Sequence, residues 1–158
     1  MQEKVDIDGE DIVLEEIADD TNTVPENNGY TLLVDSYEAT IATVGGDGYN
    51  EYCLYQKDDV YEIHYFRKYE GENEIHEAYL TDKKCSDELF AYIEKEKLIN
   101  YEGLSFGGMT GGIFVIKFKE GDKMIRISSD NVPYQNHYVF SEIRNILLKN
   151  IDKDKKLL

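Results

Sequence analysis

The segment Glu51–Leu80 decides the fold, and it reads EYCLYQKDDVYEIHYFRKYEGENEIHEAYL. Apolar and polar residues alternate through Glu51–Lys57, Val60–Tyr69 and Glu74–Leu80, which is the period of a strand with one buried face. The short acidic separators DD and EGEN contain residue types that favour tight turns. The pattern therefore predicts a meander of three antiparallel strands.

Further strands are predicted on both sides of this meander. Upstream, Tyr30–Val34 and Ala39–Val44 are rich in β-branched and aromatic residues, so we expect two strands or one bent strand before a glycine-rich turn. Downstream, Ile113–Lys119 and Lys123–Ser128 flank the turn sequence EGD and predict a hairpin. These segments together predict a sheet of about five to seven strands.

Two helices complete the predicted fold. The first is expected to start at Ser86 as its N-cap, with acidic residues in its first turn, and to bury Leu89, Phe90, Ile93 and Leu98. The second follows Pro133, and its shared apolar face is listed here: Val139, Ile143, Ile146 and Leu147, with Asn150 on the same side. The chain is thus predicted to be α+β, with an antiparallel sheet and two helices packed on one face.

A length of 158 residues suits a single domain. Residues 1–28 contain ten acidic residues and one basic residue, so we expect an acidic N-terminal arm that is mobile or loosely docked. Within this arm, Ile12, Val13 and Ile17 have helical spacing. Residues 29–151 are expected to form the domain, and residues 152–158 a charged C-terminal tail.

The formal net charge is −16, from 17 basic and 33 acidic residues. Such a field repels nucleic acid and anionic membranes, and it accelerates encounter with a basic protein. The chain begins without a basic and apolar leader, and no apolar run is as long as a membrane span requires, which is about 20 residues. We therefore expect a cytoplasmic protein that binds neither nucleic acid nor membrane directly.

One stretch matches a catalytic motif. The glycines around Ser105 fit the G-x-S-x-G pattern of serine hydrolases, and Asp122 or Asp130 and then His137 follow in the required order. A nucleophile elbow, however, needs a strand before the serine and a helix after it, whereas a helix, a loop and further glycines surround Ser105. We expect no catalytic residue and no enzyme activity; a small serine hydrolase using Ser105 and His137 is the alternative.

No metal site or cofactor is expected. Residues 4–15 match an EF-hand loop only in part, and residues 107–112 lack the lysine of a phosphate-binding loop. Cys53 and Cys85 have no metal-ligand spacing. A hairpin closed by Tyr69 and Glu74 would place Arg67 opposite His76 and His64 opposite Tyr79, which separates the two histidines.

Two sets of side chains alternate along the central strand of the meander. One contains Tyr61, Tyr65 and Arg67, and it suits either a protein-binding surface or a core face beneath a helix. The acidic residues crowd the turns of the meander. The predicted partner-binding residues are Asp58, Asp59, Tyr61, Glu62, Tyr65, Glu70, Glu72 and Glu74.

The segment KMIRISSDNVP, residues 123–133, and the helix expected after it resemble the ending of small uncharacterised α+β proteins of Gram-positive bacteria. Those proteins share a glycine-containing loop, a hairpin, an Asn-x-Pro turn and a last helix. The resemblance covers roughly residues 100–150 and implies a fold but no activity.

Three features favour a non-enzymatic inhibitor of a basic protein partner: the net charge of −16, the 13 tyrosines and the lack of a catalytic constellation. An immunity protein for a toxin and a phage anti-defence protein are the two forms of this hypothesis, the second an anti-CRISPR-like nucleic-acid mimic that engages a nucleic-acid-binding defence protein. Besides the hydrolase, a host-specific regulatory domain is an alternative.

Overall fold

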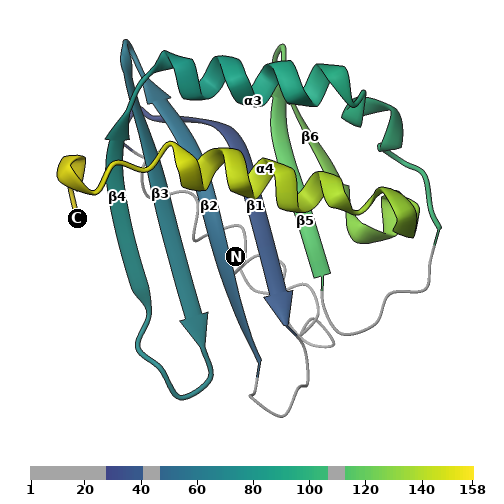
Figure 1. Cartoon of the computed structure of the whole chain (residues 1–158), viewed down its shortest axis with the longest axis horizontal. Helices are drawn as coiled ribbons and strands as arrows, with labels where there is room; N and C mark the ends of the chain where they lie inside the picture. The colour runs from purple at the N-terminus through teal and green to yellow at the C-terminus, as the bar shows by residue number, and fades with distance from the viewer. Residues whose placement is uncertain (1–27, 41–46, 107–112) are drawn as a thin grey trace, which may run out of the picture.

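The computed structural model describes residues 28–40, 47–106 and 113–158. These residues form one six-stranded antiparallel sheet with two helices in front of it (Figure 1), which confirms the predicted α+β class and architecture. The strand order is β4-β3-β2-β1-β5-β6. The strands are β1 (Thr31–Thr40), β2 (Gly48–Lys57), β3 (Val60–Tyr69), β4 (Ile75–Thr81), β5 (Ile113–Glu120) and β6 (Lys123–Ser128).

Strand β1 is a single strand with an irregularity in its pairing to β2 between Leu32 and Val34. The bent-strand alternative is therefore the one observed, although residues 41–46 lie outside the described part of the chain. Strand β2 starts at Gly48, opposite Tyr69 of β3. A Cβ atom at Gly48 would lie 2.4 Å from a ring carbon of Tyr69, so this close approach requires glycine.

The meander is confirmed, but its second hairpin differs from the prediction by one residue. Phe66 lies opposite His76, and His64 lies opposite Ala78. The predicted pairing of Arg67 with His76 is therefore wrong. Because side chains alternate with a period of two, this shift brings both histidines to the same face of the sheet.

The predicted hairpin of β5 and β6 is confirmed, and Gly121 sits in its turn with φ of +61°. Strand β5 pairs with the free side of β1, where Ile116 lies opposite Ser36. The sheet therefore joins a four-stranded meander, β1 to β4, to a two-stranded hairpin, β5 and β6, through the pairing of β1 with β5.

Helix α3 (Lys83–Lys95) starts before the predicted N-cap, because Ser86 lies inside its first turn and Asp82 occupies the N-cap position. The helix buries Cys85, Leu89 and Ile93, spaced by four residues, against the sheet. It ends where Lys97 takes a left-handed conformation with φ of +53°. A 3₁₀ turn, η1 (Leu98–Tyr101), follows.

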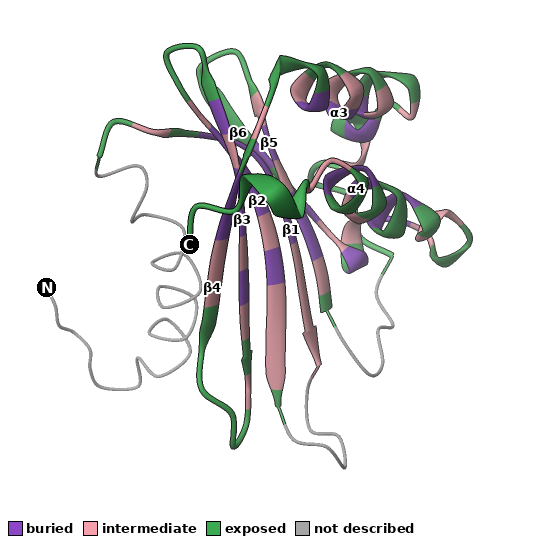
Figure 2. Cartoon of the chain, turned by 60° about the vertical axis from the view of Figure 1, so that its left-hand side comes forward, coloured by how far each residue is buried: buried purple, intermediate pink, exposed green. Residues whose placement is uncertain are grey.

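Helix α4 (Tyr138–Lys149) is preceded by two short 3₁₀ turns, η2 (Ser129–Asn131) and η3 (Tyr134–Asn136). Its predicted apolar face is buried, and Asn150 donates from Nδ2 to the carbonyl of Ile146 at 2.8 Å. Helices α3 and α4 lie side by side on one face of the sheet (Figures 1 and 2), as predicted.

The main core fills the space between the helices and the sheet. Leu54, Ile63, Ile116 and Phe118 contribute from the strands, and each is fully buried. Tyr61 also belongs to this core, so the Tyr61 face of β3 is the face beneath the helices and not an exposed stripe.

The segment expected to be a charged tail lies against the edge of the sheet. After the turn η4 (Lys153–Lys155), Lys156 forms an antiparallel bridge with Tyr79 of β4. The backbone N–H of Leu157 then donates to the carbonyl of Ala78 at 2.6 Å. The acidic arm, the EF-hand-like stretch and the glycine run at 107–112 lie outside the described residues. No helix within the described ranges is long and apolar enough to cross a membrane.

Candidate functional site

The second face of the sheet carries no helix among the described residues, and side chains of β1, β2 and β3 gather there. This helix-free face contains a small apolar cluster of Leu32, Cys53, Tyr55 and Phe66, each at most 5% exposed. Polar groups are buried among these side chains, and they are the first candidate site.

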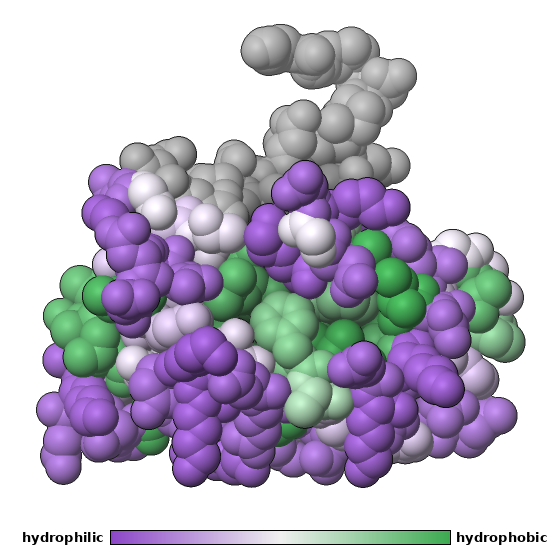
Figure 3. All heavy atoms as spheres, turned by 90° about the horizontal axis from the view of Figure 1, so that it is seen from above, coloured by the Kyte–Doolittle hydropathy of each residue, from purple (hydrophilic) through white to green (hydrophobic). Residues whose placement is uncertain are grey.

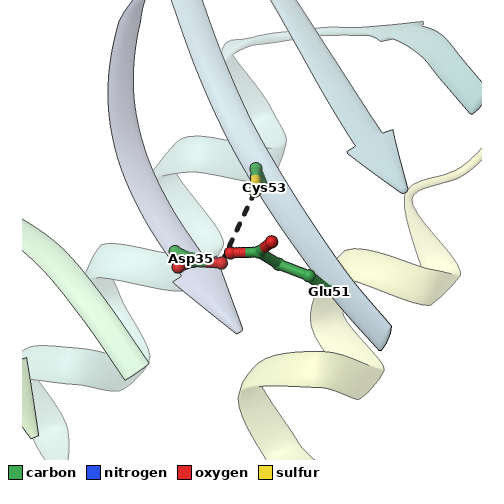
Figure 4. Close-up of side chains that lie close together, drawn as sticks. All are labelled: Asp35, Glu51 and Cys53. Atoms are coloured by element: carbon green, nitrogen blue, oxygen red, sulfur yellow. Dashed lines mark hydrogen bonds between the residues drawn. The ribbon is translucent and has the colours of Figure 1, made fainter. Parts of the chain in front are cut away.

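Asp35 of β1 and Glu51 and Cys53 of β2 point toward one another on this face (Figure 4). Their carboxylate oxygens and the sulfur lie within 4.8 Å of one another, and all three residues are buried. The thiol of Cys53 donates to Oδ1 of Asp35 at 3.5 Å. We call this group the Asp35–Glu51–Cys53 cluster.

Burial raises the pKa of the Cys53 thiol well above its usual range, and the charges of Glu51 and Asp35 add to the effect. The thiol therefore stays protonated and is a poor nucleophile. Two carboxylates and a thiol could hold a zinc ion. Such binding requires the thiolate, and its cost rises with the pKa of the thiol.

A hydrogen-bonded chain of four side chains crosses the same face. Nδ1 of His64 lies 2.9 Å from Nε2 of His76, and Nε2 of His64 lies 2.9 Å from Oε1 of Glu62. The hydroxyl of Tyr30 donates to the other oxygen of Glu62 at 2.6 Å. Burial, and secondarily the neighbouring His64, lowers the pKa of His76, so this imidazole is neutral at pH 7.

Sequence reasoning missed both groups. The signal for the first was Asp35 in an otherwise apolar strand start, together with Glu51 and Cys53 two residues apart. The pair of His64 and His76 was missed because the predicted pairing of β3 with β4 was wrong by one residue, which placed the two histidines on opposite faces of the sheet.

The residues predicted to bind a partner fall into three places. Asp58 and Asp59 form the β2–β3 turn, while Glu70, Glu72 and Glu74 lie in and after the β3–β4 turn. Because β3 connects these turns with ten residues, they are about 30 Å apart. The structure therefore does not bring the predicted acidic residues into one patch.

The remaining predicted residues lie on the strand itself. Glu62 is on the helix-free face and is engaged by His64 and Tyr30. Tyr61 is buried in the core. Tyr65 is half-buried on the helix side, where its ring stacks on Tyr52 with centroids 4.7 Å apart. Neither tyrosine has a freely exposed ring.

Ser105 does not have the surroundings of a nucleophile elbow. It follows η1 and a turn, and its neighbour Phe106 is tied by its backbone N–H to the carbonyl of Asp130 at 2.8 Å. Nε2 of His137 lies 3.0 Å from the carbonyl of Ser129 and 2.9 Å from that of Val132. This nitrogen therefore carries a proton and donates, which is unsuitable for a general base acting through Nε2.

A second candidate site lies where η1, the segment before residue 107 and the start of α4 meet. We call it the aromatic corner, and its exposed large side chains are Ile99 (41% exposed), Leu104 (44%), Phe106 (54%), Tyr134 (84%) and Tyr138 (49%). Asn131 connects its parts, because its Nδ2 donates to the carbonyl of Leu104 and its Oδ1 accepts from the backbone of Ser128 at 2.7 Å.

An apolar groove of about 520 Å³ adjoins this corner through Ile99. Phe90 and Ile93 of α3 and Phe118 of β5 line it, and Glu94, Lys97 and Glu120 surround it. Seen from above, apolar side chains form a band between rows of hydrophilic ones (Figure 3). Ile99 belongs to both the corner and the groove, and exposed apolar side chains next to an apolar groove are features that proteins use for recognition.

The fold and these two sites define an α+β protein with a buried polar cluster and an exposed aromatic surface. Comparison with protein-family models finds no match. A search of the curated proteins likewise finds no significantly similar sequence.

Proposed function

We propose that this chain is a non-enzymatic binding protein that inhibits a basic protein partner. The observation that supports this best is the aromatic corner, where Tyr134 is 84% exposed and four further large side chains are exposed. Tyrosine supplies a large contact area at a low entropic cost, and it is enriched among residues that dominate binding energies.

Charge favours a basic partner for this surface. Glu96 accepts a hydrogen bond from the hydroxyl of Tyr138 at 3.0 Å, and the exposed Glu102 and Asp130 lie next to the apolar side chains of the corner. Acidic residues around an apolar centre raise the rate of encounter with a Lys/Arg-rich surface and help to align it. The overall net charge of −16 acts in the same direction.

An immunity protein for a nuclease toxin and a phage inhibitor of a nucleic-acid-binding defence protein are both proteins of this type. A nucleic-acid mimic would need acidic groups spaced along one surface. The meander turns are about 30 Å apart, as derived from the length of β3, so they could take part only at the two ends of a long groove. The corner is therefore the better candidate for the centre of the interface.

The test starts from a purified partner of the full-length protein, obtained from the native host and confirmed by calorimetry. Phe106→Ser and Tyr134→Ala are expected to weaken binding at least tenfold each, because central aromatic side chains contribute on the order of 2 kcal/mol or more. A triple variant with Glu70, Glu72 and Glu74 changed to Gln is the control, and its affinity is expected to change less than threefold.

The salt dependence of binding tests the second half of the proposal. Affinity is expected to fall as ionic strength rises, since charge complementarity is screened by salt. A partner that is acidic, or affinity that is unchanged in both corner variants, would show the proposal to be wrong.

A further inference from the structure

The centre of the helix-free face is buried although no described helix or strand lies over it. Tyr55 and Cys53 are 0% exposed, and Leu32 and Phe66 are 5% and 4% exposed. The helices α3 and α4 lie on the opposite side of the sheet (Figure 2). Side chains on a single sheet layer cannot lose all contact with water without a second layer above them. Tyr30 and Tyr49 pack against the apolar cluster from the described part of the chain, and the segments outside the described ranges are the candidates for the rest of this layer.

Three segments lie outside the described ranges. Two of them are too short to cover the apolar cluster, and they are attached at the far end of the sheet from Leu32. Residues 41–46 follow Thr40, and residues 107–112 precede Ile113, which pairs with Ala39 near the same end of the sheet. Leu32 lies eight residues away along β1, or about 26 Å. A six-residue loop fixed at both ends reaches on the order of 12 Å from its anchors.

Residues 1–27 meet both requirements. They join the described chain at Asn28, four residues before Leu32 and therefore at the end of the sheet where Leu32 and Tyr55 lie opposite each other. Fully extended, they could span up to about 90 Å, which is far more than the face requires. Their sequence offers apolar side chains at helical spacing in Ile12, Val13 and Ile17.

Charge complementarity points to the same segment. Lys117 and Lys119 of β5 and Arg126 of β6 lie on the helix-free side of their strands, because the alternate residues Phe118 and Ile125 belong to the core beneath the helices. Residues 1–27 contain ten acidic residues and a single basic one. A basic strip at the margin of an apolar face suits a segment that is both acidic and partly apolar.

We propose that residues 1–27 dock on the helix-free face. Ile12, Val13 and Ile17 then lie over the apolar cluster that contains Leu32, Tyr55 and Phe66. The acidic neighbours of these three residues lie beside Lys117, Lys119 and Arg126. The arm thereby covers the Asp35–Glu51–Cys53 cluster. This inference concerns the other side of the sheet from the aromatic corner and is independent of the proposed function.

Zero-length cross-linking of the unmodified full chain with a carbodiimide tests the placement directly. Acidic residues 3–26 are expected to form amide links with Lys117 and Lys119. Lys123 is the matched control, because it is exposed on the same hairpin but lies on the helix side of β6. Links mainly to Lys123, or to the lysines at 153–156, or none to Lys117 and Lys119, would overturn the proposal.

Thiol labelling gives a second test on the full-length protein. Changing Ile12, Val13 and Ile17 together to Asp is expected to raise the rate at which iodoacetamide modifies Cys53 at pH 8.5 at least tenfold. Cys85, buried on the sheet-facing side of α3, should keep its rate, and it reports on the integrity of the fold. The control variant changes Thr21, Asn22 and Thr23 to Asp, which adds the same charge at polar positions.

An unchanged Cys53 rate in the apolar variant would contradict docking. If both cysteines became equally reactive, the variant would have lost its fold, and the cross-linking result on the unmodified chain would decide.

Discussion

Individual residues on the helix-free face occupy positions that their chemistry opposes. Asp35 is 0% exposed and Glu51 1% exposed, and burying a carboxylate is costly unless hydrogen bonds or opposite charges compensate. The thiol of Cys53 supplies one such hydrogen bond to Asp35. Functional residues are often found at sites that are both buried and polar. The Asp35–Glu51–Cys53 cluster is therefore a candidate site in addition to the aromatic corner.

His76 should make stability depend on pH in the mildly acidic range. Its pKa is lowered in the folded protein, chiefly by burial, so the unfolded chain binds the proton first as the pH falls. The stabilisation is complete above the unfolded-state pKa, near 6.5, and is lost as the pH falls toward the folded-state value. Urea unfolding of the wild type at pH 7.5 and 5.5 should show lower stability at pH 5.5.

His76→Gln should reduce this loss, because glutamine does not titrate and can still donate a hydrogen bond toward His64. The comparison is between the two pH-dependent differences, so a uniform destabilisation by the substitution does not affect it. An equal loss in both proteins would assign the pH dependence to other groups.

Among the secondary-structure elements, the alternation of residue types predicted the strands well but not their exact pairing. Val60–Tyr69 was predicted with the bounds that β3 has. The pairing of β3 with β4 was not, because the residues of the turn EGEN allow more than one closure. The start of α3 was also misplaced, since Ser86 resembled an N-cap while the contact of Cys85 with the core extends the helix backward.

The 3₁₀ turns around Asn131 should be sensitive to a single substitution. Asn131→Ala removes the acceptor for the backbone N–H of Ser128 and the donor to the carbonyl of Leu104, and we expect a loss of about 1 to 3 kcal/mol in the free energy of unfolding. Chemical denaturation measures it. Asp82→Ala is the control, because the Asp82 side chain makes no capping hydrogen bond to α3, and we expect a change below about 0.5 kcal/mol.

A loss after Asn131→Ala no larger than that of the control would show that these hydrogen bonds do not hold the aromatic corner together. The corner itself could not have been predicted from the sequence. Its members come from η1, the adjoining loop and the start of α4, and contacts between segments distant in sequence, such as the hydrogen bond from Phe106 to Asp130, bring them together.

At the scale of the whole molecule, the many partly buried tyrosines should limit stability at high pH. Burial raises the pKa of Tyr52 to about 12, and a hydrogen bond to Glu77 with burial raises that of Tyr79 to about 12. Their unfolded-state pKa is near 10, so the stabilisation is complete below pH 10 and is lost as the pH rises toward 12.

Phenol ionisation, followed by ultraviolet absorbance, should therefore occur in two stages. The rings whose pKa is raised in the folded protein, such as those of Tyr52 and Tyr79, ionise in the later stage, together with the loss of the far-ultraviolet circular dichroism signal of the sheet. A single non-cooperative titration with the sheet intact up to pH 12 would contradict the expectation.

The two outer strands of the sheet differ in a way that bears on self-association. The backbone of Leu157 bonds to Ala78 and so blocks part of the outer edge of β4, whereas no described segment pairs with the outer edge of β6. Within the described chain the edge of β6 is therefore the more open of the two, and edge-to-edge joining of two copies through β6 gives a two-fold pair in which this edge is covered in both copies. The next copy would meet the partly covered edge of β4, so extended strand addition along the described sheet requires the C-terminal segment to detach.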